Sequence, residues 1–136
     1  MKVMHYSQMD ATEMAFLADP ANRDLQEHWE DATVSLAGAL VMLSPTYPKA
    51  LLFSGEEGEW AEIRSHVEAL RGTPLHERLA DNLTVARDVW REWEENGHSP
   101  QLHEAVDSYL EALYDETVYL QFYPADPPRR PQRRER

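Results

Sequence analysis

Apolar residues recur at intervals of three and four over most of this 136-residue chain, which is the spacing of one helix face. The clearest stripe runs from Leu25 to Leu43 and spans about five turns of helix. Shorter stripes with the same period predict four further helices, over residues 10–19, 60–70, 73–96 and 100–113, the last continuing further if Leu120 belongs to it. The pattern therefore predicts about five helices.

Residues that cap or stop helices lie between these stripes. Small polar side chains before a stripe, proline in the first turn and glycine after the last turn are the usual signals. The boundary residues are Ser7 or Asp10, Ser44-Pro45, Gly72, Thr73-Pro74, Asn96-Gly97 and Ser99-Pro100. Together with the chain length, they predict an all-α fold, a single-domain bundle of about five helices.

Three short segments resist a helical interpretation. Residues 2–6, 50–53 and 118–123 are apolar or alternating and rich in strand-favouring types. They could pair into a very small β element at one end of the bundle, which would make the fold α+β. This is the alternative to the all-α prediction, because short apolar runs are ambiguous by period alone.

Charge is unevenly distributed along the chain. The formal net charge is −12, with 13 Lys+Arg against 25 Asp+Glu. Residues 1–126 hold 24 acids and 8 basic residues, whereas the last ten residues hold five arginines and one glutamate. We therefore divide the chain into an acidic helical domain, 1–123, and a Pro/Arg-rich tail, 124–136, which we expect to be flexible because its prolines exclude helix.

The tail has two functional interpretations besides that of a solvated terminus. It can contact nucleic acid, or it can order on an acidic surface of a partner or of the protein's own body. The residues that would make this contact are Arg129, Arg130, Arg133, Arg134 and Arg136.

Catalytic and cofactor motifs are absent from the sequence. No cysteine is present, which excludes disulfides, thiolate metal sites and cysteine nucleophiles. There is no Gly-x-Ser-x-Gly elbow, and the glycines of residues 54–59 are accompanied by glutamates that would repel a phosphate. Those glutamates are better placed to complement the dipole at a helix N-terminus. We expect no cofactor and no enzymatic activity.

Three histidines are paired with acids at i,i+4, and such pairs are candidate metal ligands. The pairs are Asp24–His28, Glu62–His66 and His103–Asp107. Each pair lies on one helix face, but the Glu-x-x-His pattern of di-iron bundles is missing from the helices. The simpler interpretation is surface hydrogen bonding, so we expect no metal site. An enzyme built from scattered residues such as Glu62, His66 and His103 remains as an alternative.

The longest strongly apolar run, residues 34–43, is about half of what a bilayer crossing requires. Residues 1–10 show no apolar core of a secretory signal. We therefore expect a cytoplasmic protein that does not associate with membranes.

Aromatic residues fall into two groups. The four tryptophans lie on the apolar stripes and are predicted to be core residues. Several tyrosines near the end of the last helix should face outward if Leu110 and Leu113 face inward. Tyrosines surrounded by acids are typical of protein-contact surfaces. The predicted patch consists of Asp107, Tyr109, Glu111, Tyr114, Asp115 and Glu116.

The acidic body disfavours direct nucleic-acid binding and favours a basic protein partner. Rows of carboxylates on rigid helices can occupy a groove shaped for a nucleic-acid backbone and steer association. The leading hypothesis is a non-catalytic inhibitor that imitates nucleic acid or neutralises a basic nuclease, with a second group of contact residues at Glu56, Glu57, Glu59 and Glu62. The alternative is a structural subunit of an assembly such as a phage particle or effector complex, with the Arg-rich tail as an ordered arm. A third possibility is that the charge only maintains solubility.

Overall fold

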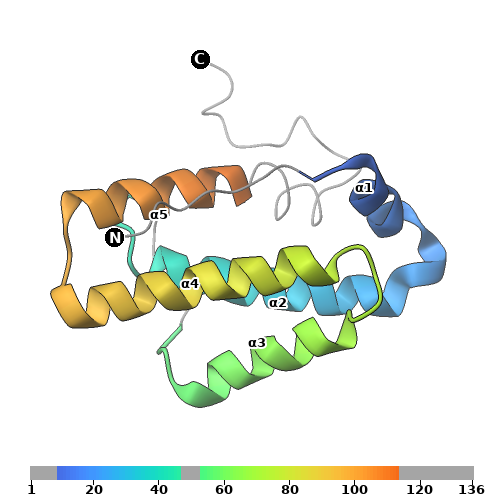
Figure 1. Cartoon of the computed structure of the whole chain (residues 1–136), viewed down its shortest axis with the longest axis horizontal. Coiled ribbons are helices and arrows are strands. Elements are labelled where there is room, and N and C mark those ends of the chain that lie inside the picture. The colour runs from blue at the N-terminus through green and yellow to red at the C-terminus, as the bar shows by residue number, and fades with distance from the viewer. Residues whose placement is uncertain (1–8, 47–52, 114–136) are drawn as a thin grey trace.

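The computed structural model of the chain describes residues 9–46 and 53–113. In this part of the chain it contains five α-helices and one 3-10 turn, and no strand (Figure 1). The elements are α1 (Ala11–Ala18), η1 (Pro20–Asn22), α2 (Arg23–Val41), α3 (Glu57–Ala69), α4 (His76–Asn96) and α5 (Pro100–Leu113). The all-α prediction is confirmed. The segments predicted as strands lie outside the described residues, except that Phe53 is a buried loop residue.

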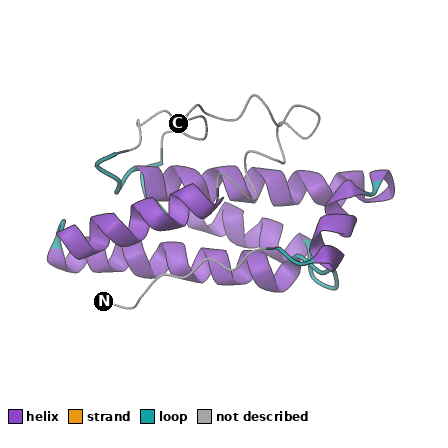
Figure 2. Cartoon of the chain, turned by 90° about the horizontal axis from the view of Figure 1, so that it is seen from above, coloured by secondary structure: helices purple, strands orange, loops and turns teal. Residues whose placement is uncertain are grey.

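Helix α2 is the central element of the bundle. It packs against α3, α4 and α5, and Figure 1 shows α3 and α5 on opposite sides of the α2–α4 pair. The long helices run along roughly one common direction, as the view from above in Figure 2 shows. From Ala32 to Leu43 no residue of α2 or its last turn is exposed. The small residues at 37–39 allow close approach, and the Trp90 indole N–H reaches the Ala39 carbonyl at 2.8 Å.

The helix ends follow local signals that the sequence predicts. Asp10 and Glu13 form a reciprocal capping box at α1, with both backbone N–H groups 2.8 Å from the partner carboxylate. Ser99 caps α5 by accepting the Leu102 N–H at 3.0 Å. Gly97 ends α4 with φ +76°, a conformation that glycine adopts without a side-chain clash.

Two details of α4 differ from the prediction. The helix begins at His76 rather than at Thr73-Pro74, and the Thr73 hydroxyl accepts the Leu75 N–H within the preceding turn. The buried stripe includes Asn82, which is 6% exposed, whereas Leu83 is only half-buried. Position 82 shares a face with Leu79 and Ala86, while position 83 lies about 100° further around the helix.

Tryptophans form an aromatic cluster between α3 and α4. Phe53, Trp60 and Trp90 meet edge to face, with ring centroids 4.9 to 6.1 Å apart. Trp29 is fully buried in α2, and Trp93 is half-buried against the core. The predicted core position is thus confirmed for Trp29, Trp60 and Trp90, whereas Trp93 lies at the edge of the core. Gly55 has φ +82°, and a Cβ there would lie 2.6 Å from the Trp90 ring.

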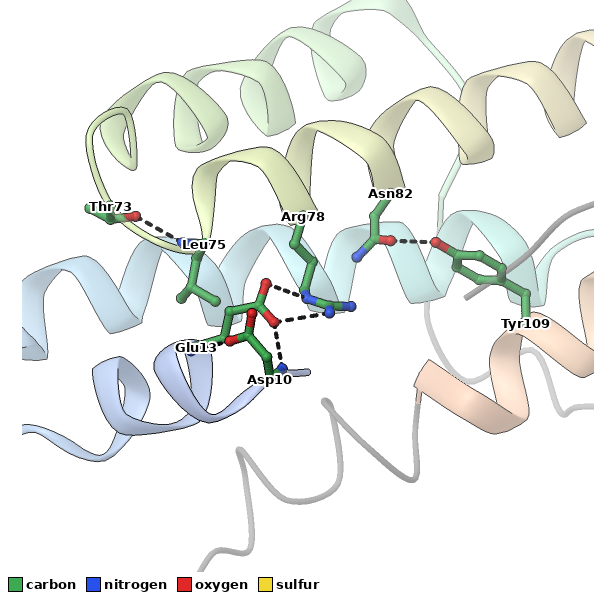
Figure 3. Close-up of polar contacts among 7 residues, drawn as sticks. All are labelled: Asp10, Glu13, Thr73, Leu75, Arg78, Asn82 and Tyr109. Atoms are coloured by element: carbon green, nitrogen blue, oxygen red, sulfur yellow. Dashed lines mark hydrogen bonds and ion pairs between the residues drawn. The ribbon is translucent and has the colours of Figure 1, made fainter. Parts of the chain in front are cut away.

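Helix α1 is joined to α4 by a buried ion pair. The Glu13 carboxylate lies 2.9 Å from Arg78 Nε and 3.0 Å from its Nη2, and both side chains are about nine-tenths buried (Figure 3). The same carboxylate accepts the Asp10 N–H, so one side chain both caps α1 and attaches it to α4.

In the described ranges, no helix combines the length and apolarity needed to cross a bilayer.

Candidate partner-binding surface

The four glutamates predicted at the start of α3 have different surroundings. Glu59 is engaged within the loop: its carboxylate accepts the Ser54 hydroxyl at 2.7 Å and the Gly55 N–H at 2.8 Å. These bonds, with the Ser54 hydroxyl as the largest contributor, lower the pKa of Glu59 below its usual 4.5. Glu57 lies 3.6 Å from Arg64 and 3.3 Å from Arg87. Both glutamates therefore stabilise the α3 terminus.

Glu56 and Glu62 are the two members of this group that are exposed to solvent without an ion pair among the described residues. Glu56 is the residue before α3, where a negative charge is favourable near the helix N-terminus. Glu62 lies six residues, nearly two turns, further along α3 and is exposed. Of the predicted group, these two remain open to a partner.

The prediction of an exposed tyrosine patch on α5 is wrong for Tyr109. Its side chain is 4% exposed and its hydroxyl donates to Asn82 Oδ1 of α4 (Figure 3). Tyr109 is next to Leu110 on the helix, so it still falls within the wide apolar arc that faces the core, and Asn82 satisfies its hydroxyl.

The other members of the α5 patch are divided. Asp107 accepts the hydroxyls of Ser44 and Thr46, the latter at 2.7 Å, and so ties α5 to the end of α2. Glu111 is exposed. The remaining predicted contact residues lie outside the described residues: Tyr114, Asp115, Glu116, Arg129, Arg130, Arg133, Arg134 and Arg136.

The structure does not bring the predicted groups together. Helices α3 and α5 lie on opposite sides of the bundle (Figure 1). The histidines proposed for an enzyme site are separated in the same way: His66 contacts His28 at 2.9 Å, whereas His103 contacts His98 at 2.8 Å. Within the described ranges, no three metal-ligating side chains gather in one place.

Arginine pairing is a feature that sequence reasoning missed. The described residues include 21 acids and six arginines. Five of these arginines form ion pairs within the body: Arg64 and Arg87 with Glu57, Arg71 with Glu68, Arg78 with Glu13, and Arg91 with Asp88. Most arginines among the described residues are therefore paired with carboxylates of the same protein. Most of the carboxylates, in contrast, form no ion pair with an arginine.

The outer face of α4 carries the longest row of carboxylates. Positions 77, 81, 88, 92 and 95 are separated by four, seven, four and three residues, which places them on one stripe about 27 Å long. Glu77, Asp81 and Glu95 are exposed, while Asp88 pairs with Arg91 and Glu92 accepts from Asn96. We call these five residues the α4 acidic stripe. Its helical spacing could be read from the sequence.

Helix α2 carries a shorter row of the same kind. Asp24, Glu27 and Asp31 are exposed at intervals of three and four residues in its first half. They extend over about 10 Å, and we call them the α2 acidic stripe. The two stripes have similar chemistry on different helices, so each can serve as a control for the other.

Comparisons with protein-family models, with curated proteins and with solved structures find no match for this chain.

Proposed function

We propose that this protein is a non-catalytic acidic protein that binds a basic, nucleic-acid-handling protein and inhibits or neutralises it. The observation that supports this proposal is the internal pairing of arginines beside outward-facing carboxylates. Five of the six arginines in the described body have an acidic partner. Of the α4 acidic stripe, Glu77, Asp81 and Glu95 are exposed, and Arg91, which pairs with Asp88, is the one arginine in an ion pair with the stripe among the described residues.

A surface of this kind has a definite electrostatic preference. Its carboxylates repel a nucleic-acid backbone and attract clustered lysines and arginines of the kind that bind one. Because α4 is a regular helix, the carboxylates are held at fixed intervals before any partner arrives, so little ordering entropy is lost on binding. Such charge complementarity mainly increases the association rate and the specificity.

The test compares two charge-reversal variants of the full chain. One carries Glu77→Lys, Asp81→Lys and Glu95→Lys in the α4 acidic stripe. The matched control carries Asp24→Lys, Glu27→Lys and Asp31→Lys in the α2 acidic stripe. Both change the net charge by the same amount and alter only exposed positions, and circular dichroism would verify that both retain their helices.

Each tagged protein would be used to capture partners from source-cell extract, with elution in steps of increasing salt. We expect one stoichiometric basic protein with the native chain and with the α2 variant, and its loss with the α4 variant. Equal loss of capture with both variants would show that net charge, not the α4 acidic stripe, drives capture, and undiminished capture by both would show that neither stripe is needed. The absence of any basic protein would contradict the proposal.

Inhibition is tested with the captured protein after purification. The native chain should compete with nucleic acid for it, with an affinity that falls steeply as salt rises. Simultaneous binding of nucleic acid and of this chain, without competition, would contradict the inhibitory role.

A further inference from the structure

The junction between α4 and α5 contains a chain of three hydrogen-bonded rings. The Trp93 indole N–H donates to His98 Nε2 at 3.2 Å. On the other side of the same imidazole, His98 Nδ1 lies 2.8 Å from His103 Nε2. Trp93 is on α4, His98 is in the connecting loop and His103 is on α5. The three rings therefore link the end of one helix to the start of the next.

This arrangement permits only one distribution of protons. An indole nitrogen can donate but cannot accept, so His98 Nε2 must be the unprotonated nitrogen. A neutral His98 then carries its proton on Nδ1 and donates it to His103 Nε2, which must also be unprotonated. Both imidazoles are therefore neutral when the chain of hydrogen bonds is complete.

Adding one proton to either imidazole breaks the contact with Trp93. A proton on His98 goes to Nε2, which then faces the indole N–H as a second donor. A proton on His103 goes to Nε2, so that His98 Nδ1 must become the acceptor and move its own proton to Nε2. In both cases two donors face each other at Trp93.

We propose that Trp93, His98 and His103 form a proton-sensitive latch between α4 and α5, closed when both imidazoles are neutral and released when either takes up a proton. This inference does not rest on the proposed function, because it follows from the geometry of the junction alone.

The charges around the latch are mainly negative. No lysine or arginine occurs between Glu92 and Leu113, and no charged residue occurs between Ala32 and Thr46, in the second half of α2 and the residues after it. On α3, the ring of Trp60 contacts the ring of Trp90 of α4. The charged residue of α3 near Trp60 is Glu57, which is paired with Arg87. The charged groups of α4 and α5 near the latch are Arg91, paired with Asp88, and Glu92, Glu94, Glu95, Glu104 and Asp107. A protonated histidine would thus be the one positive charge within residues 92–113.

A second pair of histidines provides an internal contrast. His28 Nδ1 of α2 lies 2.9 Å from His66 Nδ1 of α3, and the ring centroids are 5.2 Å apart. No tryptophan N–H fixes the acceptor in this pair, so either imidazole can be the donor. One added proton converts the bond into a charge-assisted one instead of breaking it. The α2–α3 contact should therefore survive the acidification that releases the latch.

The test follows the indole N–H signals of the full chain by nitrogen-15 NMR between pH 8 and pH 5. The Trp93 signal, assigned with a Trp93→Phe variant, should lose its hydrogen-bonded shift as the histidines take up protons. Trp60 and Trp90 donate to the carbonyls of Gly55 and Ala39, which do not titrate, so their signals should stay constant. At pH 8 the imidazole nitrogens of His98 and His103 should both report protonation at Nδ1.

A His98→Gln variant separates the latch from a general effect of acid. The glutamine carbonyl can accept from Trp93 but cannot be protonated in this range, so the Trp93 signal should become independent of pH. The matched variant His28→Gln should leave the Trp93 titration unchanged. The latch is contradicted if the Trp93 signal stays constant while His98 titrates, if His98 carries its proton on Nε2 at pH 8, or if His28→Gln abolishes the response.

Discussion

Helices α1 and α5 both attach to α4, but different forces hold them. The residue that α1 buries is Glu13, whose carboxylate pairs with Arg78 near the start of α4. Phe16 and Leu17 of α1 are only partly buried. By contrast, α5 buries Leu102, Val106, Tyr109, Leu110 and Leu113. One helix is held mainly by a charged contact and the other mainly by apolar burial.

The difference indicates which part of the molecule determines global stability. Apolar burial contributes directly to folding, at about 25 cal/mol per Å². A buried ion pair gains much less, because removing both charges from water offsets most of their attraction. We therefore expect the α1 contact to define where α1 lies, and α5 to carry a larger share of the folding free energy. Four substitutions test this contrast, from the largest expected effect to the smallest.

Leu110→Ala should cause the largest loss. Leu110 is fully buried, so truncation removes apolar contacts and leaves a cavity, at a cost of about 4 kcal/mol. Urea denaturation followed by circular dichroism measures this as a lower midpoint. Glu111→Ala, at the adjacent exposed position, should change the free energy of unfolding by less than about 0.5 kcal/mol. Equal effects at the two positions would contradict the assigned face of α5.

Glu13→Ala should destabilise the protein by about 3 kcal/mol, because it leaves Arg78 buried without this carboxylate and removes the acceptor of the Asp10 N–H from the α1 capping box. Hydrogen exchange should show the loss in α1 before the other helices. Glu13→Gln keeps an acceptor for the Asp10 N–H and should recover about 1 kcal/mol. Uniform exchange across all helices would argue against a local role for the pair.

Tyr109→Phe tests the polar contact inside the α4–α5 interface. Removing the hydroxyl leaves the buried Asn82 carbonyl without this donor, and we expect a loss of about 1 to 2 kcal/mol in thermal or urea unfolding. The aromatic ring remains, so the helices should stay packed. No change in stability would indicate that Tyr109 does not bury its hydroxyl against α4.

Glu59→Gln extends the contrast to α3, which begins with an exposed acidic cap. Because hydrogen bonding lowers the pKa of Glu59 in the folded state, its stabilising effect is present above pH 4.5 and is lost as pH falls through the lowered value. Solvent screening keeps the effect to about 0.5 kcal/mol. Native and variant proteins should differ at pH 7 and converge at low pH in urea denaturation, and a gap that does not change with pH would contradict the role given to the Glu59 carboxylate.

The helix boundaries could be predicted because their causes are local. Asp10, Ser99 and Gly97 act on backbone groups within four residues, and their positions in the sequence already specify the contact. The Tyr109 prediction failed because the partner that allows its hydroxyl to be buried, Asn82, is 27 residues away. Spacing alone cannot show that such a partner will be present.

The same distinction applies to charge. The pairs Arg71–Glu68 and Arg91–Asp88 are three residues apart and follow from helix geometry. The Arg78–Glu13 pair joins residues 65 positions apart and depends on the packing of α1 against α4. The regular spacing of the α4 acidic stripe can be read from the sequence. It points to a partner-binding surface only when the structure also shows that most of the described arginines pair with other carboxylates.

The central position of α2 has a consequence for synthesis. Its second half and the turn that follows, from Ala32 to Leu43, contain no exposed residue in the folded protein, and α2 packs against α3, α4 and α5. On the ribosome this segment emerges about 70 residues before Leu113, the end of α5. At usual elongation rates of 5 to 20 residues per second, it would wait about 4 to 14 s for its last partner. During that interval the apolar face of this segment lacks the helices that cover it in the folded protein.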